Sequence, residues 1–327
     1  MTLILSKSDV NAFLDIDACI DAVASAFLAQ AQGNALEPGV LGTHVDEGGF
    51  HIKTSGLGSA RRYFAAKINA NFPRNRLQNG LPTIQGVVAL FDASNGAVLA
   101  LIDSVGITTL RTAAATAVAA KHLARSESAT VTVIGCGVQG RSQLLALSRI
   151  CALGRVWAHD VDTRLAREYA EAMSAVIGCK VVAVDDYRRS ARESDIIVTC
   201  TPARTPVLSM ADVREGTFIA AVGADNEEKH EIEPALLASG KVVVDVLEQC
   251  ATIGDLHHAL DAGAMRREDV HAELGDIVSG RRPGRENAAE VIIFDSTGTA
   301  LEDVAAASLV YERAVAAGAG LEMSLAS

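Results

Sequence analysis

The sequence predicts an α/β protein in which a doubly wound parallel sheet follows an α+β domain. Two observations lead to this fold class. From residue 129 onward, short runs rich in Val and Ile alternate with helix-like segments, which is typical of a parallel sheet covered by helices. Between residues 39 and 103, strand-like segments follow one another without helices between them, which indicates an antiparallel or mixed sheet.

Size, charge and cysteine usage narrow the class of protein. The 327 residues are 49% hydrophobic, which is enough for a large core and more than one domain. The formal net charge of −11 argues against nucleic-acid and membrane-surface binding, because an acidic surface repels phosphates. The apolar runs are shorter than the roughly 20 residues of a membrane span, and the N-terminal run is too short for a signal-peptide core. Six scattered cysteines fit neither a disulfide scaffold nor a zinc site, so we expect a reducing cytoplasm and no bound metal.

The α+β domain is expected to begin with a helix and to continue as strands. Apolar residues from Ile16 to Phe27 recur at helical spacing within residues 9–32, and Gly33 ends the helix. The turn sequence DASNG lies between two apolar arms and predicts a hairpin. The elements expected after the helix are strands at 39–46, 49–56 and 62–72, the hairpin at 86–103 and an Ala-rich helix at 105–125.

The second part alternates strands and helices. The expected strands are ATVTVIG, RVWAHD, KVVAV, DIIVTC, TFIAAVG, KVVVDV and EVIIFDSTG, with the helices GRSQLLALSRI and DTRLAREYAEAM between the first three. The last helix is expected from near Thr299 to about Ala317, and it should pack on the first domain because it lies beyond the last strand of the parallel sheet. We therefore expect one domain from residues 1–122 and 299–327 and a second from residues 123–298.

A dinucleotide-binding motif opens the second domain. Gly135, Gly137 and Gly140 form G-x-G-x-x-G directly after a strand and at the start of a helix, as in a Rossmann fold. The glycines permit the tight turn, the approach of a pyrophosphate and close helix–strand packing, while the helix N-terminus presents N–H groups to the phosphates. Asp160 lies 20 positions after Gly140, where a carboxylate accepts hydrogen bonds from a ribose 2′-OH and favours NAD over NADP. Arg164 is the alternative, since it could approach a 2′-phosphate.

The segment TIQGVVALFDASNGAVLALIDSVGITTLRTAAATAVAAKHLAR, followed by VIGCGVQGRSQ, resembles the ornithine cyclodeaminase/mu-crystallin family. The resemblance runs from about Lys67 to FDSTGTALEDVAAA. It implies a Rossmann domain inserted into an α+β substrate-binding domain, which also forms a homodimer. It further implies NAD(P) chemistry at the Cα of an amino or imino acid, such as ornithine cyclodeamination, alanine dehydrogenation or ketimine reduction.

Three residues match the family's catalytic positions. By resemblance, Lys67 and Arg111 hold the substrate α-carboxylate, and Asp225 handles protons at the amine or imine. A guanidinium grips a carboxylate well, and an arginine among small residues needs an anion. The alternatives are an internal salt bridge for Arg111, for instance to Asp103, a solvated strand face for Lys67 and a turn cap for Asp225.

The expected cofactor-binding residues combine the glycine motif with positions that match the family. They are Thr83, Thr112, Gly135, Gly137, Val138, Gln139, Gly140, Asp160, Thr201, Val222, Lys229, Ser296 and Gly298. The expected cofactor is NAD.

The strand GGFHIKTSGL points to the substrate. One face is apolar, and the other carries His51 and Lys53. Many family members carry a carboxylate-binding arginine in this region, but none is present between Pro38 and Ser59. A lysine would repel the second amine of ornithine. The stretch resembles the branch of iminosuccinate reductases and ectoine-utilisation proteins, which pair H-x-K with AAK-x-NANFP.

These features predict an NADH-dependent imine reductase for a dicarboxylic imino acid such as iminosuccinate, with His51 and Lys53 on the distal carboxylate. The alternatives are a cyclodeaminase-type lyase that recycles NAD and a catalytically silent, crystallin-like NAD(P)H-binding protein. The alternative for the strand is that His51 pairs with an acid such as Asp46 and that Lys53 is solvated.

Overall fold

The computed structural model describes residues 1–58 and 61–325. The chain divides into two compact units, Met1–Arg111 with Thr299–Ser327 (unit 1) and Thr112–Gly298 (unit 2). The division falls within helix α4 (Ser104–Leu123), whereas the sequence places the domain boundary at the end of this helix. Each unit is described separately below.

Unit 1 is built on a mixed sheet, as the run of successive strands predicts. The strand order is β17-β1-β6-β5-β4-β3-β2. Neighbouring strands from β2 to β6 pair antiparallel, and β1 pairs parallel with β6. The strands are β1 (Thr2–Leu5), β2 (Gly39–Val45), β3 (Gly48–Gly58), β4 (Arg62–Asn71), β5 (Ile84–Asp92), β6 (Val98–Asp103) and β17 (Leu321–Met323).

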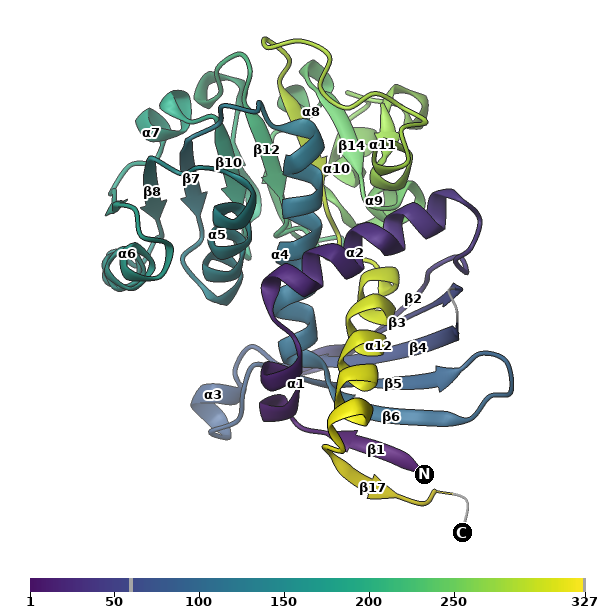
Figure 1. Ribbon diagram of the computed structural model, residues 1–327. Helices are drawn as coiled ribbons and strands as arrows, with labels where there is room; N and C mark the ends of the chain where they lie inside the picture. The colour runs from purple at the N-terminus through teal and green to yellow at the C-terminus, as the bar shows by residue number, and fades with distance from the viewer. Residues whose placement is uncertain (59–60, 326–327) are drawn as a thin grey trace. The chain divides into compact units, whose positions relative to one another are not determined.

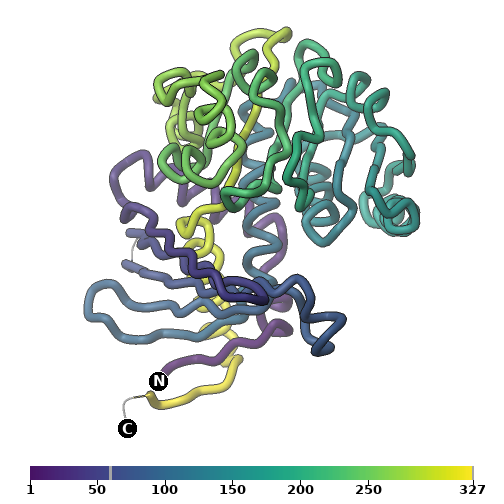
Figure 2. Tube along the Cα trace, turned by 180° about the vertical axis from the view of Figure 1, so that it is seen from behind, coloured from purple at the N-terminus to yellow at the C-terminus, as the bar shows by residue number. Residues whose placement is uncertain are grey.

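The helices of unit 1 are α1 (Lys7–Phe13), α2 (Ile16–Ala31), α3 (Asn75–Gln78), the first part of α4 and α12 (Ala300–Ala317). Helices α1, α2 and α12 lie on one face of the sheet (Figure 1, Figure 2). Figure 1 shows α1, α2 and α12 in front of the strands, and Figure 2 shows the strands in front of α12. Helix α12 contacts α2, β3 and β4, which confirms that the last helix packs on the N-terminal part of the chain.

The single helix expected at residues 9–32 is two helices. Each has its own N-cap: Ser6 accepts from the N–H of Asp9 before α1, and Asp15 accepts from the N–H of Ala18 before α2. Leu14 between them is extended. The apolar periodicity runs through the break, so the capping side chains are the local signal that ends the first helix.

The polar face of β3 is the buried one. Lys53 on β3 lies directly opposite Lys67 on β4, and both are buried. Phe50 and Ile68, on the other face of these strands, are 39% and 40% exposed. The alternation along the strand is therefore as predicted, and it turns the charged side chains toward the helices and part of the apolar set outward.

Unit 2 is a doubly wound sheet, as predicted. Its strands are all parallel, in the order β15-β14-β16-β12-β10-β7-β8-β9, so the winding direction reverses between β7 and β10. The strands are β7 (Thr130–Ile134), β8 (Arg155–His159), β9 (Val181–Ala183), β10 (Ile196–Thr199), β12 (Phe218–Ala221), β14 (Lys241–Val244), β15 (Ala272–Glu273) and β16 (Ile292–Asp295). The central strands β10, β12 and β16 are buried throughout, which explains their continuous apolar runs.

Helices and a small second sheet complete unit 2. The helices are the rest of α4, α5 (Val138–Ile150), α6 (Thr163–Ile177), α7 (Arg188–Glu193), α8 (Pro234–Ser239), α9 (Leu247–Ile253), α10 (Asp255–Asp261) and α11 (Leu274–Val278), with 3-10 turns at Met210–Asp212 and Arg267–Asp269. Strands β11 (Arg204–Leu208) and β13 (His230–Ile232) pair parallel. The short β13 carries Glu231, which accepts hydrogen bonds from the last residue of β10 and from the loops after β10 and β12.

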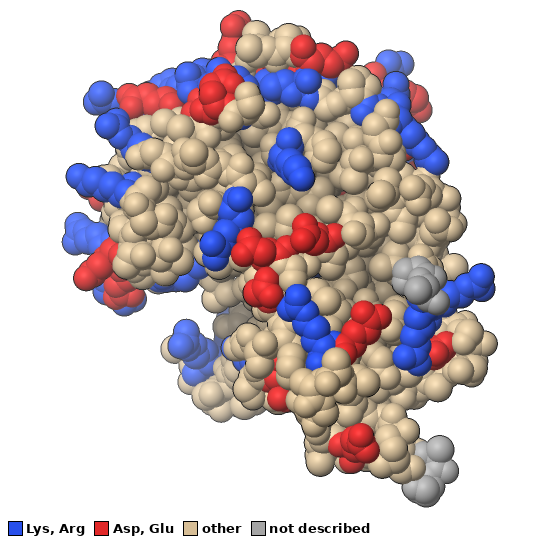
Figure 3. All heavy atoms as spheres, in the orientation of Figure 1, with Lys and Arg blue, Asp and Glu red and all other residues tan. Residues whose placement is uncertain are grey.

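Charges of both signs are mixed on the surface. On the face seen in Figure 3, Lys and Arg side chains lie among Asp and Glu side chains. Exposed pairs such as Arg189 with Glu193 typically contribute less than about 1 kcal/mol, so the fold depends mainly on its buried core. Among residues 1–58 and 61–325, none of the helices is long and apolar enough to cross a membrane.

Candidate functional site

The glycine motif of unit 2 has the geometry that its spacing predicts. Gly135 follows β7 with φ +105°, and a Cβ there would lie 2.7 Å from the carbonyl oxygen of Cys200. A Cβ on Gly140 would lie 2.1 Å from the carbonyl oxygen of Gly135, so this glycine permits close packing of α5 on the loop. Gly137 is different, because a Cβ there would meet no atom within 4 Å. Packing within the chain therefore does not explain Gly137, and the approach of a cofactor pyrophosphate to this glycine stays a prediction. Val138 and Gln139 form the first turn of α5.

Asp160 lies beside this loop at the end of β8. Its Oδ2 accepts a hydrogen bond from the backbone N–H of Cys136 at 2.9 Å. The alternative partner for a 2′-phosphate, Arg164, makes ion pairs with Asp162 at 3.2 Å and Glu168 at 2.8 Å. A carboxylate next to the glycine loop and an arginine that already has anionic partners both suit the 2′-OH of NAD.

A buried carboxylate that sequence reasoning missed ties two loops of unit 2 together. Glu231 accepts four hydrogen bonds: from Thr199 Oγ1 at 2.8 Å, from the N–H and Oγ1 of Thr201 at 2.6 and 2.7 Å, and from the N–H of Gly223 at 2.8 Å. Burial raises the pKa of Glu231, against these hydrogen bonds, which lower it. Thr201 was predicted to bind the cofactor, and Val222 immediately precedes Gly223. Glu231 therefore holds the loops after β10 and β12.

Asp225 lies in the loop after β12, as the sequence predicts. Its Oδ1 pairs with the Lys229 ammonium at 2.6 Å, and its side chain is 55% exposed. The side-chain oxygen of Asn226 accepts from the N–H groups of Glu228 and Lys229, so Asn226 stabilises the turn that Asp225 was considered to cap. The carbonyl oxygen of Lys229 lies 2.8 Å from Nε2 of the His258 ring, which is hydrogen-bonding distance.

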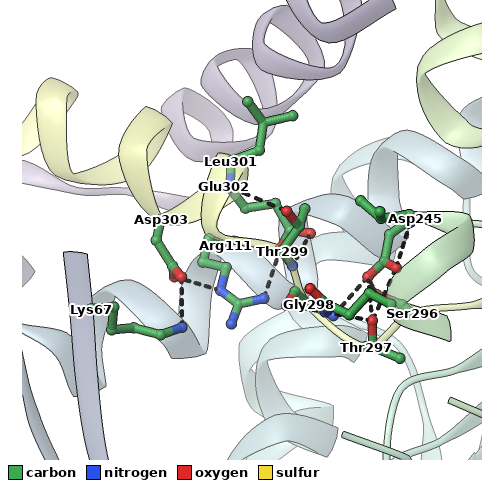
Figure 4. A network of polar contacts seen from close by, with 12 residues as sticks. Lys67, Arg111, Asp245, Ser296, Thr297, Gly298, Thr299, Leu301, Glu302 and Asp303 are labelled. Atoms are coloured by element: carbon green, nitrogen blue, oxygen red, sulfur yellow. Dashed lines mark hydrogen bonds and ion pairs between the residues drawn. The ribbon is translucent and has the colours of Figure 1, made fainter. Parts of the chain in front are cut away.

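The segment after β16 is held by Asp245 (Figure 4). The buried Asp245 accepts from the N–H of Gly298 at 2.6 Å and from the hydroxyls of Thr297 at 3.1 Å and Ser296 at 3.3 Å. Gln249 donates to Thr297 Oγ1 and to the Gly298 carbonyl. The predicted cofactor residues Ser296 and Gly298 thus belong to a fixed turn of unit 2.

Unit 1 holds a buried cluster of charges (Figure 4), which we call the cation cluster: Lys53, Lys67 and Arg111 with Glu302 and Asp303. The Lys67 ammonium lies 2.7 Å from Asp303 Oδ2. Arg111 donates from Nε to Asp303 Oδ1 at 2.9 Å and from Nη1 to Glu302 at 2.8 Å. All five side chains are buried. The sequence predicted the cations but not the two acids of α12, whose signal is an ED pair followed directly by the apolar run VAAA.

The alternatives for these cations are resolved by their surroundings. The internal salt bridge considered for Arg111 is present, but its partners are Glu302 and Asp303. Asp103, the partner suggested from the sequence, accepts instead from the N–H groups of Val105 and Gly106 at the start of α4. A solvated Lys67 is wrong, because its side chain is 3% exposed. A solvated Lys53 is likewise wrong, because this residue is 7% exposed.

The surroundings of Lys67 lower the pKa of its ammonium group. Burial lowers its pKa first, and the charges of Arg111 and Lys53 lower it further, to about 7, while Asp303 opposes the shift. Burial raises the pKa of Asp303, but Arg111, Lys67 and Lys53 outweigh burial and leave it below its usual range. An anion bound beside Lys67 would relieve the repulsion among the cations.

The remaining predicted residues flank these groups. His51 lies opposite Asn69 on the buried face of β3 and is half-buried. Thr83 precedes β5, and its carbonyl oxygen accepts from the N–H of Phe72. Thr112 is a buried residue of α4 that follows Arg111. Among the residues that the structure describes, no three His, Cys, Asp or Glu side chains are arranged to hold a metal ion.

Sequence comparison gives relatives over the whole chain. The model of the ornithine cyclodeaminase/mu-crystallin family matches residues 1–318. Alanine dehydrogenase of Archaeoglobus fulgidus is 37% identical over 322 residues, which cover 98% of this chain and 97% of the relative. Iminosuccinate reductase of Paracoccus denitrificans is 32% identical over 324 residues, which cover 99% of this chain and 100% of the relative.

Solved structures share the fold over nearly the whole chain. Thermococcus litoralis Δ1-pyrroline-2-carboxylate reductase with NADH and L-proline has a TM-score of 0.94 at 34% identity, covering 98% of this chain and 100% of its own. An archaeal alanine dehydrogenase dimer with bound NAD has a TM-score of 0.94 at 36% identity, covering 99% of both chains. The iminosuccinate reductase of Paracoccus denitrificans with NAD⁺ has a TM-score of 0.92 at 31% identity, also covering 99% of both.

These comparisons confirm the expected family and fold class. The cofactor expected from the glycine motif, NAD, is present as NADH, NAD or NAD⁺ in each of the three structures. The relatives are enzymes of amino-acid and imine redox chemistry, as expected for an oxidoreductase acting on C=N or CH–NH2 groups. The chain belongs to the ornithine cyclodeaminase/mu-crystallin family, in the class of NAD-dependent oxidoreductases that its sequence predicts.

Proposed function

We propose that this protein is an NADH-dependent imine reductase that converts a small dicarboxylic imino acid, such as iminosuccinate, into the amino acid. The observation that carries the proposal is the buried cation cluster of unit 1. Lys53 lies directly opposite Lys67 and is buried with it, so a third cation adjoins the two, Lys67 and Arg111, that would hold an α-carboxylate. Relatives that reduce imines, including iminosuccinate reductase, support the reaction class.

The proposed roles follow from the chemistry of each side chain. Arg111 and Lys67 bind the α-carboxylate and orient the C=N bond. When bound at the glycine loop, NADH supplies the hydride that the imino carbon accepts. The electron pair of the C=N bond moves to nitrogen, which takes up a proton, and Asp225 relays that proton with Lys229 hydrogen-bonded to it. The products are the amino acid and NAD⁺.

The substrate's second end is assigned to Lys53 and His51. Both side chains lie on the buried face of β3, two residues apart. A carboxylate is attracted by this lysine, whereas the side-chain amine of ornithine is repelled. This favours a dicarboxylic imino acid over a diamino acid.

The test is NADH oxidation with ammonia and each of four oxo acids: oxaloacetate, pyruvate, glyoxylate and 2-oxoglutarate. Oxaloacetate is expected to give the largest kcat/KM, with net NADH consumption and aspartate as product. Ammonia release from ornithine without net redox change would instead establish the cyclodeaminase. NADH binding without turnover of any oxo, imino or amino acid would establish a crystallin-like binding protein. Tighter binding of NADPH than of NADH would overturn the cofactor assignment.

We also propose a homodimer, in the cytoplasm, formed through unit 1. The outward face of its sheet exposes the large apolar side chains of Leu41, Val45, Phe50 and Ile68, and the edge strand β2 also exposes Val40. Figure 2 shows this face of the strands in front of α12. Such a surface favours a partner, and an archaeal alanine dehydrogenase of the same fold is a dimer. A monomeric mass by light scattering at micromolar concentration would refute the dimer.

A further inference from the structure

One carboxylate of unit 1 is shared by two cations. Asp303 presents Oδ2 to the Lys67 ammonium at 2.7 Å and Oδ1 to Nε of Arg111 at 2.9 Å. The Asp303 side chain is 1% exposed. Figure 4 shows Lys67 and Arg111 converging on it from β4 and α4. Its two oxygens therefore fix the distance between the two cationic groups.

The start of α12 determines where this carboxylate lies. Thr299 caps the helix by accepting from the N–H of Leu301, and Glu302 Oε1 accepts in return from the N–H of Thr299. This capping box fixes the first turn, which carries both Glu302 and Asp303. Glu302 also accepts from Nη1 of Arg111, so the first turn of one helix holds the guanidinium at two points.

The groups that face Lys67 come from three elements. Lys53 lies opposite it on β3, Arg111 approaches from α4, and Asp303 pairs with it from α12. His51 lies on the same face of β3. Glu302 and, on α2, the buried Cys19 adjoin Arg111; burial raises the pKa of Cys19 to about 12, so its thiol stays neutral. Two cations thus disfavour the ammonium form of Lys67, and one carboxylate favours it.

We propose that Asp303 is a positioning residue: it holds Lys67 and Arg111 for a single substrate carboxylate and, against Lys53, keeps Lys67 protonated. The inference rests on the proposed function in that the anion is the substrate's carboxylate. Because burial and the neighbouring cations bring the pKa of Lys67 to about 7, anion binding weakens as pH rises through this region. Lys53 lowers the pKa of Lys67 and Asp303 raises it, so the two residues shift the pH dependence of anion binding in opposite directions.

The experiment compares pH profiles of kcat/KM for wild type, Asp303→Asn and Lys53→Met, with the best oxo acid of the panel and with ammonia saturating. Asp303→Asn should lower kcat/KM at pH 6 at least about tenfold, as for loss of one partner of a buried charge pair. The kcat/KM of the wild type should fall on the alkaline side of the pH profile, and Asp303→Asn should move this alkaline limb to lower pH by about one unit or more. Lys53→Met should move that limb to higher pH. Glu302→Gln is the matched control, since it removes an equal charge from Arg111 and should move the limb much less.

A purely structural Asp303 would lower activity at every pH without moving the limb, and this result would overturn the inference. If Asp303→Asn does not fold, Lys53→Met decides alone, because an unmoved limb in that variant refutes the opposing roles. If no compound of the panel is turned over, the proposed function fails. The inference is then decided by calorimetry of oxalate binding to the NADH complex from pH 6 to 9. Affinity that falls above about pH 7 in the wild type, and at higher pH in Lys53→Met, supports it; pH-independent binding or no binding overturns it.

Discussion

Replacing Lys53 by methionine should change substrate preference rather than abolish the reaction. Lys53 is buried and lies opposite Lys67 in the β3–β4 register, where facing Cβ atoms are about 4.5–5.5 Å apart. Methionine keeps the length and most of the volume of the side chain, so little cavity is left. The change therefore removes a charge while largely preserving the packing.

Two effects of opposite sign determine the expected magnitude. A hydrogen bond to a charged group contributes about 1.5–3 kcal/mol, so its loss lowers kcat/KM for a dicarboxylic substrate by about 10- to 150-fold. A monocarboxylic substrate makes no such contact. The kcat/KM for this substrate should rise slightly instead, because Lys53→Met removes one of the cations that lower the pKa of Lys67.

The assay measures kcat/KM at pH 7 with oxaloacetate and with pyruvate, each with ammonia and NADH. Lys7→Met is the matched control, since Lys7 is an exposed lysine of α1. The ratio of the two kcat/KM values should fall at least about tenfold in Lys53→Met and stay constant in the control. Equal losses on both substrates, or no loss on either, would refute the assignment of Lys53 to a distal carboxylate.

Three further changes test other parts of the molecule. Arg111→Ala should abolish measurable turnover but leave the Kd for NADH nearly unchanged, since loss of a buried charged partner costs about 2–5 kcal/mol; near-normal activity would make Arg111 purely structural. Glu231→Gln places an amide donor against the N–H donors of Thr201 and Gly223, so both thermal stability and NADH affinity should drop, by about 1–3 kcal/mol in unfolding free energy; unchanged NADH affinity would exclude a role for Glu231 in positioning the loops. Burial raises the pKa of Asp295 to about 7, so the folded state holds a proton that the unfolded state releases near pH 4. Stability should thus fall as pH rises from about 4 through 7, and chemical unfolding of Asp295→Asn should show a smaller fall; an identical pH dependence in both proteins would contradict this.

The features predicted correctly are those with a strong local signal. The buried strands of unit 2 appear as continuous Val and Ile runs, and two positions of the glycine motif, Gly135 and Gly140, have a geometry that follows from backbone sterics. In unit 1, strict alternation in β3 predicted a polar face with Lys53. The strands β1 and β17 were not predicted, because segments of four and three residues are too short to show a period.

The features missed are those that depend on contacts between distant residues. Asp303 is separated from Lys67 and Arg111 by most of the chain. The sequence around the ED pair of α12 does not indicate which residues these acids pair with. Glu231 lies in a three-residue strand, and its four donors come from the end of β10 and from the loops after β10 and β12. Side-chain chemistry of this kind becomes visible only when the topology has placed the elements.

The acids of α12 also change the reason for expecting a dicarboxylic substrate. From sequence, Lys53, Lys67 and Arg111 on one wall would repel one another and so require an anionic ligand. In the structure Glu302 and Asp303 already pair with Arg111 and Lys67, so part of that demand is met within the chain. The number of cations therefore no longer indicates whether the substrate has one carboxylate or two.

The remaining argument for a dicarboxylic substrate is the position of Lys53, which is buried, adjoins Lys67 and lies on the face that carries His51. Substrate preference thus depends on whether the Lys53 ammonium reaches the ligand, and a difference between two substrates in one variant measures that contact independently of the cluster's total charge.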